Sequence, residues 1–147
     1  MRRLIAVLAF ALTVGLLTGC SFGPREPLET AIPAALVASD LGIIEAEATT
    51  GMDGFSKYLS VYSTFDRDTI TTDELIEIVR LTIENCDSNN ISLLQIGGLD
   101  GTADGYEYID LGAVGLELGF ARGTSIPDAF TIPWEFAVEL VNEHDND

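Results

Sequence analysis

Two stretches of the chain alternate apolar and polar residues with a period of two, which is typical of half-buried β-strands. The first runs from Ile43 to Thr50 and the second from Lys57 to Phe65, and the segment Gly51-Met-Asp-Gly54 between them is rich in turn residues. We therefore predict a β-hairpin. The core side of the first strand is expected to carry Ile44, Ala46 and Ala48, and that of the second strand Leu59, Val61 and Phe65.

A helical period replaces the alternation between Thr72 and about Asn85. Thr71 and Glu74 have the spacing of a capping box, and Ile70 and Leu75 are placed to form a hydrophobic staple. The core side of this predicted helix is expected to carry Ile76, Val79, Ile83 and Cys86. On its solvent side, Arg80 is expected to form ion pairs with Glu77 and Glu84. Two further helices are predicted, one from Pro33 to about Leu41 before Gly42, and one opened by Pro133 that contains Trp134, Phe136, Ala137, Leu140 and Val141.

The remaining elements complete a second hairpin. Ile91 to Gly97 is predicted as its first strand, Leu99 to Gly105 as a turn, and Tyr106 to Ile109 as its second strand.

Leu111 to Leu118 fits either a strand or a helix capped by Asp110, and the helix is favoured; Arg122 to Phe130 is expected to be a loop. The order α-ββ-α-ββ-α-α, with antiparallel hairpins and helices on one face, predicts a two-layer α+β sandwich.

The amino-terminal segment has a different pattern. Arg2 and Arg3 precede a run of 14 mostly apolar residues from Leu4 to Leu17, followed by Thr18-Gly19-Cys20. A membrane-spanning helix needs about 20 apolar residues, so this layout favours a secretory signal over a permanent span.

Leu17-Thr18-Gly19-Cys20 resembles the lipobox of bacterial lipoproteins. This resemblance implies that residues 1–19 are cleaved as a signal peptide and that the sulfur of Cys20 carries a diacylglyceryl group. Residues 20–27 then form a short tether, residues 28–142 a single globular domain and residues 143–147 an acidic tail. The expected location is the extracytoplasmic side of a cell membrane, to which two or three acyl chains give stable anchoring.

Charge limits the partners of the mature protein. The whole chain has a net charge of −17, and loss of Arg2 and Arg3 with the signal changes this to −19. Such a surface repels phosphate backbones and anionic headgroups, which excludes nucleic acid and leaves basic or neutral envelope proteins or glycans as the plausible partners.

Few residues of the chain suggest a catalytic or metal-binding role. His144, the one histidine, lies within the last four residues of the chain, so histidine-dependent triads and HExxH sites are excluded, and no cofactor motif is present. Asp100 and Asp104 match part of a calcium loop, but its twelfth position is Leu111, which makes a hairpin turn the better interpretation and leaves no metal site expected. Cys86 is expected to be a buried, inert thiol, and the acidic residues near Asp73 are explained by the start of a helix.

The candidate binding face consists of tyrosines. If Tyr58 and Tyr62 point away from the helices and Tyr106 or Tyr108 joins them, their rings would line a surface edged by Glu45 and Glu47. Ordinary cross-strand pairing of tyrosines is the alternative explanation.

These observations favour a lipid-anchored, non-catalytic interaction domain of the cell envelope, with no family resemblance for residues 28–147. Two alternatives stay open, a cell-wall hydrolase that uses carboxylates alone and a cation-binding accessory lipoprotein.

Overall fold

The structure is a computed structural model that describes residues 27–87, 90–105, 107–118 and 129–145. The signal segment, Cys20 and most of the tether therefore lie outside the described residues. Within the described ranges, no helix is both long and apolar enough to cross a membrane.

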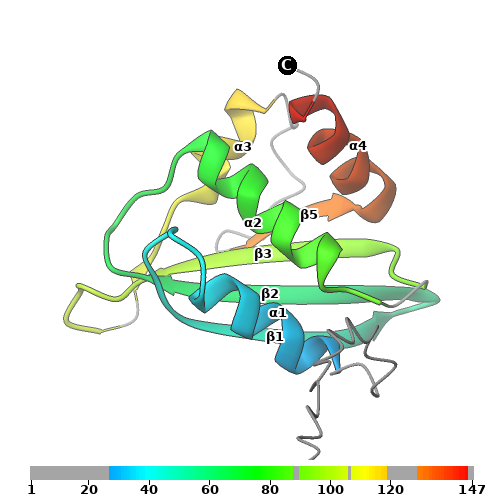
Figure 1. Cartoon of the computed structure of the whole chain (residues 1–147), viewed down its shortest axis with the longest axis horizontal. Coiled ribbons are helices and arrows are strands. Elements are labelled where there is room, and N and C mark those ends of the chain that lie inside the picture. The colour runs from blue at the N-terminus through cyan, green and yellow to red at the C-terminus, as the bar shows by residue number, and fades with distance from the viewer. Residues whose placement is uncertain (1–26, 88–89, 106, 119–128, 146–147) are drawn as a thin grey trace, which may run out of the picture.

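One mixed sheet forms the centre of the fold (Figure 1). Its strands are β1 (Ile43–Asp53), β2 (Ser56–Phe65), β3 (Leu93–Asp100), β4 (Glu107–Tyr108) and β5 (Ala129–Pro133). β1 and β2 form the predicted antiparallel hairpin. β2 pairs in parallel with β3, and both β4 and β5 pair antiparallel with the other side of β3, at opposite ends of that strand.

All the described helices lie on one side of this sheet (Figure 1). They are α1 (Leu28–Val37), α2 (Thr72–Glu84), α3 (Leu111–Glu117) and α4 (Trp134–His144). The sheet residues that face them, including Leu59, Val61, Leu94 and Ile96, are almost completely buried. The prediction of an α+β fold with helices against one face of the sheet is thus confirmed.

The start of α2 follows the sequence prediction closely. The Thr71 hydroxyl accepts a hydrogen bond from the backbone of Glu74, and the Glu74 carboxylate accepts one from the backbone of Thr71 at 2.7 Å. Ile70 and Leu75, the expected staple, are both buried. The deepest side chains of α2 are Leu75, Ile78, Val79 and Thr82, whereas Ile83 and Cys86 are only partly buried against the core.

Two features of the sheet differ from the prediction. The pairing of β2 with β3 is parallel, because α2 carries the chain back across the sheet before β3 begins. Residues 129–133, predicted as loop and helix start, form strand β5, with Phe130 and Ile132 buried against the helices. The observed order is therefore α-ββ-α-ββ-α-β-α.

Three local predictions were wrong in detail. α1 begins at Leu28 and contains Pro33 in its interior, so it starts five residues earlier than expected. A bulge between Ile43 and Glu45 turns Ile43 into the core and leaves Ile44 58% exposed. α4 continues to His144, and Asp145 accepts a hydrogen bond from Arg80 at 2.5 Å, so residues 143–145 belong to the last helix and its cap and not to a tail.

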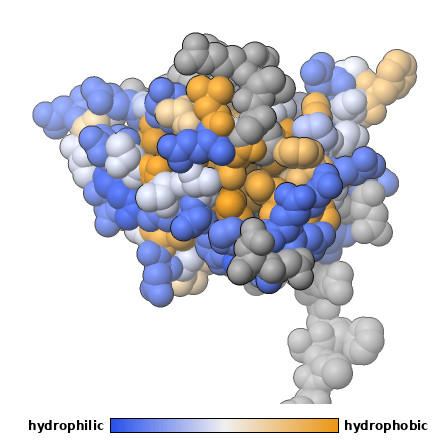
Figure 2. Space-filling model, turned by 90° about the horizontal axis from the view of Figure 1, so that it is seen from above, coloured by the Kyte–Doolittle hydropathy of each residue, from blue (hydrophilic) through white to orange (hydrophobic). Residues whose placement is uncertain are grey.

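The ambiguous segment after Asp110 is a helix. α3 begins at Leu111, and the Asp110 side chain accepts a hydrogen bond from the backbone of Gly112 at 2.9 Å, which supplies the expected cap. Figure 2 shows the α3 and α4 side of the molecule as mostly hydrophilic, with an apolar area near the middle. Leu116 and Phe136, 44% and 42% exposed, are the most exposed large apolar side chains of these two helices.

Candidate functional site

The sheet face opposite the helices carries two of the predicted tyrosines. The register places Tyr58 and Tyr62 of β2 on the side opposite the buried Leu59 and Val61. We call this side the outer face and define it by Glu45, Glu47, Tyr58, Tyr62, Thr64 and Leu99. Its described residues alternate with those of the core, as the sequence predicted.

Each tyrosine ring on the outer face lies over a glycine of a neighbouring strand. A Cβ atom added to Gly51 would lie 2.3 Å from the ring of Tyr58, and one added to Gly97 would lie 2.1 Å from the ring of Tyr62. Gly51 is the β1 partner of Tyr58, and Gly97 is the β3 partner of Tyr62. The two rings therefore lean in opposite directions and are held flat against the sheet by backbone that has no side chain beneath them.

A shallow depression of about 240 Å³ lies beside the ring of Tyr62. Glu45 and Glu47 border it from β1, Thr64 from β2 and Leu99 from β3. Glu45 and Glu47 are exposed, whereas Tyr62, Thr64 and Leu99 are half-buried. The depression thus combines an aromatic ring, an apolar side chain and two carboxylates, which suits a positively charged or hydroxylated group.

Tyr108 extends the outer face toward β4. It is the partner of Leu99, which in turn pairs with Thr64, so the three residues form one row across the sheet. Tyr108 is 50% exposed. Tyr106, the fourth tyrosine of the predicted face, lies outside the described residues.

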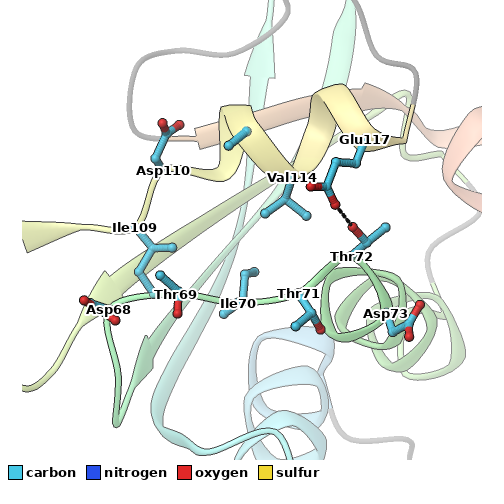
Figure 3. Close-up of a pocket in the computed structure, with 11 residues that line it drawn as sticks. Asp68, Thr69, Ile70, Thr71, Thr72, Asp73, Ile109, Asp110, Val114 and Glu117 are labelled. Atoms are coloured by element: carbon cyan, nitrogen blue, oxygen red, sulfur yellow. Dashed lines mark hydrogen bonds between the residues drawn. The ribbon is translucent and has the colours of Figure 1, made fainter.

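A larger cleft, which the sequence did not reveal, lies between the start of α2 and α3 (Figure 3). Its volume is about 590 Å³. Ile70, Ile109 and Val114 form an apolar floor, and each is less than 9% exposed. Residues 68–73 and 109–117 meet here although about 40 positions separate them along the chain.

Three polar side chains around this cleft, those of Thr72, Asp110 and Glu117, have structural partners. Thr72 donates a hydrogen bond of 2.6 Å to Glu117, which links α2 to α3 across the opening (Figure 3). Asp110 caps α3, and Asp68 and Asp73 lie at the ends of the cleft with their carboxyl groups turned away from its centre. Two carboxylates that converge on one point, as a hydrolase of the predicted type needs, are not found in this part of the described structure.

Asp100 is occupied by its own turn. Its carboxylate accepts hydrogen bonds from the backbone nitrogen of Thr102 at 2.7 Å and from the Thr102 hydroxyl at 2.6 Å. These bonds stabilise the ionised form and lower the pKa of Asp100 below its ordinary value of 3.8. Among the described residues, no three or more histidine, cysteine, aspartate or glutamate side chains are placed to hold a metal ion. Asp100 and Asp104 therefore belong to no such group.

Of the two cysteines, the structure describes Cys86 and not Cys20. Cys86, predicted as a buried thiol, packs against the core but is only partly buried. It lies where α2 has ended and the chain turns toward β3, so solvent reaches one side of it. Cys20 lies outside the described residues, and its lipidation stays a prediction.

Comparison with protein-family models, with curated proteins and with solved structures finds no match to this chain.

Proposed function

We propose that this chain is a lipid-anchored lipoprotein of the bacterial cell envelope whose mature domain binds a basic or neutral envelope component without catalysis. The anchor rests on the sequence: a basic start, an apolar run too short for a span, and Leu17-Thr18-Gly19-Cys20. The binding surface is the outer face around Tyr62.

The depression beside Tyr62 is the observation that supports this choice of surface. Its aromatic ring is fixed over Gly97, so little conformational freedom is lost when a partner covers it. Glu45 and Glu47 stand next to it in β1, paired with Thr64 and Tyr62 respectively. A lysine or arginine side chain fits this arrangement, with its aliphatic part on the ring and its charge near the carboxylates.

A direct test of the anchor compares the wild-type chain with Cys20→Ser. We expect the wild type to sediment with membranes and to show a lipid-modified amino-terminal cysteine by mass spectrometry. The serine variant is expected to lose the lipid and to keep the uncleaved signal, because the sulfur of Cys20 is the atom that accepts the diacylglyceryl group. An unmodified wild-type cysteine would overturn the anchor.

Binding at the outer face is tested by NMR titration with a lysine-rich peptide as the probe. We expect the resonances of Tyr62, Glu45 and Glu47 to move first. Since each exposed charge pair contributes about 0.2 to 1 kcal/mol, loss of two pairs in the double variant Glu45→Gln/Glu47→Gln should weaken binding by about twofold to thirtyfold.

A matched control removes the same charge elsewhere. Glu139 and Glu143 are exposed on α4, on the other side of the molecule from the outer face. The variant Glu139→Gln/Glu143→Gln should bind the peptide like the wild type. An equal loss of peptide affinity in both double variants would show that binding depends on net charge alone, and would overturn the outer face as a specific binding surface.

A further inference from the structure

The β1–β2 turn is the most exposed apolar point of the described surface. Phe55 lies at its tip with a relative exposure of 106%, and the neighbouring Met52 is 63% exposed. Gly54, with φ of +60°, provides the left-handed conformation that the turn requires. Two large apolar side chains thus project from one end of the sheet.

This turn lies at the end of the molecule where the described chain begins. Figure 1 shows the start of α1 and the β1–β2 turn at the same end of the domain. A hydrogen bond of 3.5 Å from the Thr50 hydroxyl of β1 to Glu29 in the first turn of α1 links the two elements there. Any tether that enters the domain at Leu28 therefore arrives at the end of the domain that carries the β1–β2 turn.

The length of the tether limits how far this end can move from the bilayer. Seven residues, 21–27, follow Cys20 before α1 begins, and a fully extended chain of that length spans at most about 25 Å. Because the lipid would hold Cys20 in the membrane surface, the end of the domain that carries Phe55 would be the end nearest to the membrane.

We propose that the β1–β2 turn is a second membrane contact, in which Phe55 and Met52 insert into the headgroup region and orient the tethered domain. This inference rests on the proposed lipid anchor. Burial of one phenylalanine side chain favours the inserted orientation by about tenfold to hundredfold, which is sufficient once the tether has already confined the turn near the surface.

Charge determines which lipids suit this contact. Glu29 and Asp53 lie at the same end of the domain, and the chain as a whole is strongly acidic. Anionic headgroups would repel them, so the turn is expected to insert into zwitterionic lipid and to withdraw as anionic lipid is added. The outer face beside Glu45 and Glu47 would then remain free to meet a partner.

Tryptophan fluorescence in vesicles tests the contact. Trp134 is the chain's one tryptophan, so the full-length chain is purified from membranes in a Trp134→Phe background that carries Phe55→Trp. In vesicles of phosphatidylcholine with brominated acyl chains, we expect the emission of the residue 55 probe to shift to shorter wavelength and to be quenched. Replacement of part of the lipid by phosphatidylglycerol should reduce both effects.

The matched control is Ile44→Trp in the same background. Ile44 is 58% exposed at the opposite end of β1, about 30 Å away at the usual rise of a strand. We expect no quenching at this position. Hydrogen exchange of the unsubstituted chain gives a second measurement, in which residues 52–57 should exchange more slowly in vesicles than in detergent.

The outcomes separate this inference from the anchor. A chain that carries lipid on Cys20 but shows no quenching at residue 55, or equal quenching at residues 44 and 55, overturns the membrane contact and leaves the anchor intact. A change at residue 55 seen only in native membranes would point to a protein partner and would also overturn it. A chain without lipid on Cys20 overturns the anchor and the contact that rests on it.

Discussion

Arg67 joins three parts of the fold, and its replacement is the sharpest test of how the domain is held together. Its guanidinium donates hydrogen bonds to the carbonyl oxygen of Leu41 at 2.6 Å, to the carboxylate of Glu74 at 2.7 Å and to the carbonyl oxygen of Thr69 at 3.1 Å. The same group lies 5.9 Å from the centre of the Phe65 ring. The turn before β1, the end of β2 and the cap of α2 thus meet at one side chain.

The change Arg67→Met removes these hydrogen bonds and keeps most of the aliphatic volume. A hydrogen bond to a charged group contributes about 1.5 to 3 kcal/mol when buried, but the side chain of Arg67 is 34% exposed and solvent weakens each bond. We expect the free energy of unfolding to fall by about 2 to 3 kcal/mol. With an unfolding entropy of about 2.1 cal/mol/K per residue over roughly 120 residues, the melting temperature should fall by about 10 °C.

Urea unfolding and circular dichroism measure this loss, and Arg80→Met is the matched control. In the described structure Arg80 bonds to carboxylates alone, those of Glu77 and Asp145; its side chain is 23% exposed, and we expect its replacement to cost about 1 to 2 kcal/mol. At 1 M salt the cost of Arg80→Met should shrink further, whereas Arg67→Met should keep the part that comes from carbonyl oxygens. An equal reduction of the two costs by salt would refute this reasoning.

Three further predictions concern single groups. Gly97→Ala should displace the ring of Tyr62 and destabilise the domain by about 1 to 3 kcal/mol, as measured by urea unfolding; an unshifted Tyr62 resonance would contradict the close contact. Ser63→Ala should leave stability unchanged or higher, because the buried hydroxyl of Ser63 has no hydrogen-bond partner in the described structure, and a clear loss by the same assay would reveal one. An NMR titration should place the pKa of Asp100 below 3.8 and show it rise in Thr102→Val; because the folded-state pKa is lowered, the associated stability is present above the unfolded-state pKa and is lost as the pH falls through the lowered value.

Elements specified by neighbouring residues were predictable from the sequence. The cap and staple of α2 need only residues 70–75, and the alternation of β2 needs only its own side chains, so both were predicted correctly. The cap at Asp110 likewise identifies α3 as a helix. In each case the information lies within one turn or one strand.

Features that depend on distant pairing were not predictable in this way. β5 is five residues long and ends in Pro133, and it becomes a strand only because the edge of β3 is available to it. The parallel pairing of β2 and β3 depends on where α2 packs, not on either strand's own pattern. The α2–α3 cleft was missed for the same reason, since its two walls are distant along the chain.

The late position of β5 has a consequence for the growing chain. β3 carries the buried residues Leu94 and Ile96, and in the described structure the edge of β3 away from β2 is paired at these positions by Ile132 and Phe130 of β5. Synthesis from the amino terminus therefore produces β3 with an unpaired edge for more than thirty residues before its partner exists. Any chain that stops before residue 129 presents that apolar edge to other chains, and premature termination in this region should yield aggregates and not a smaller folded domain.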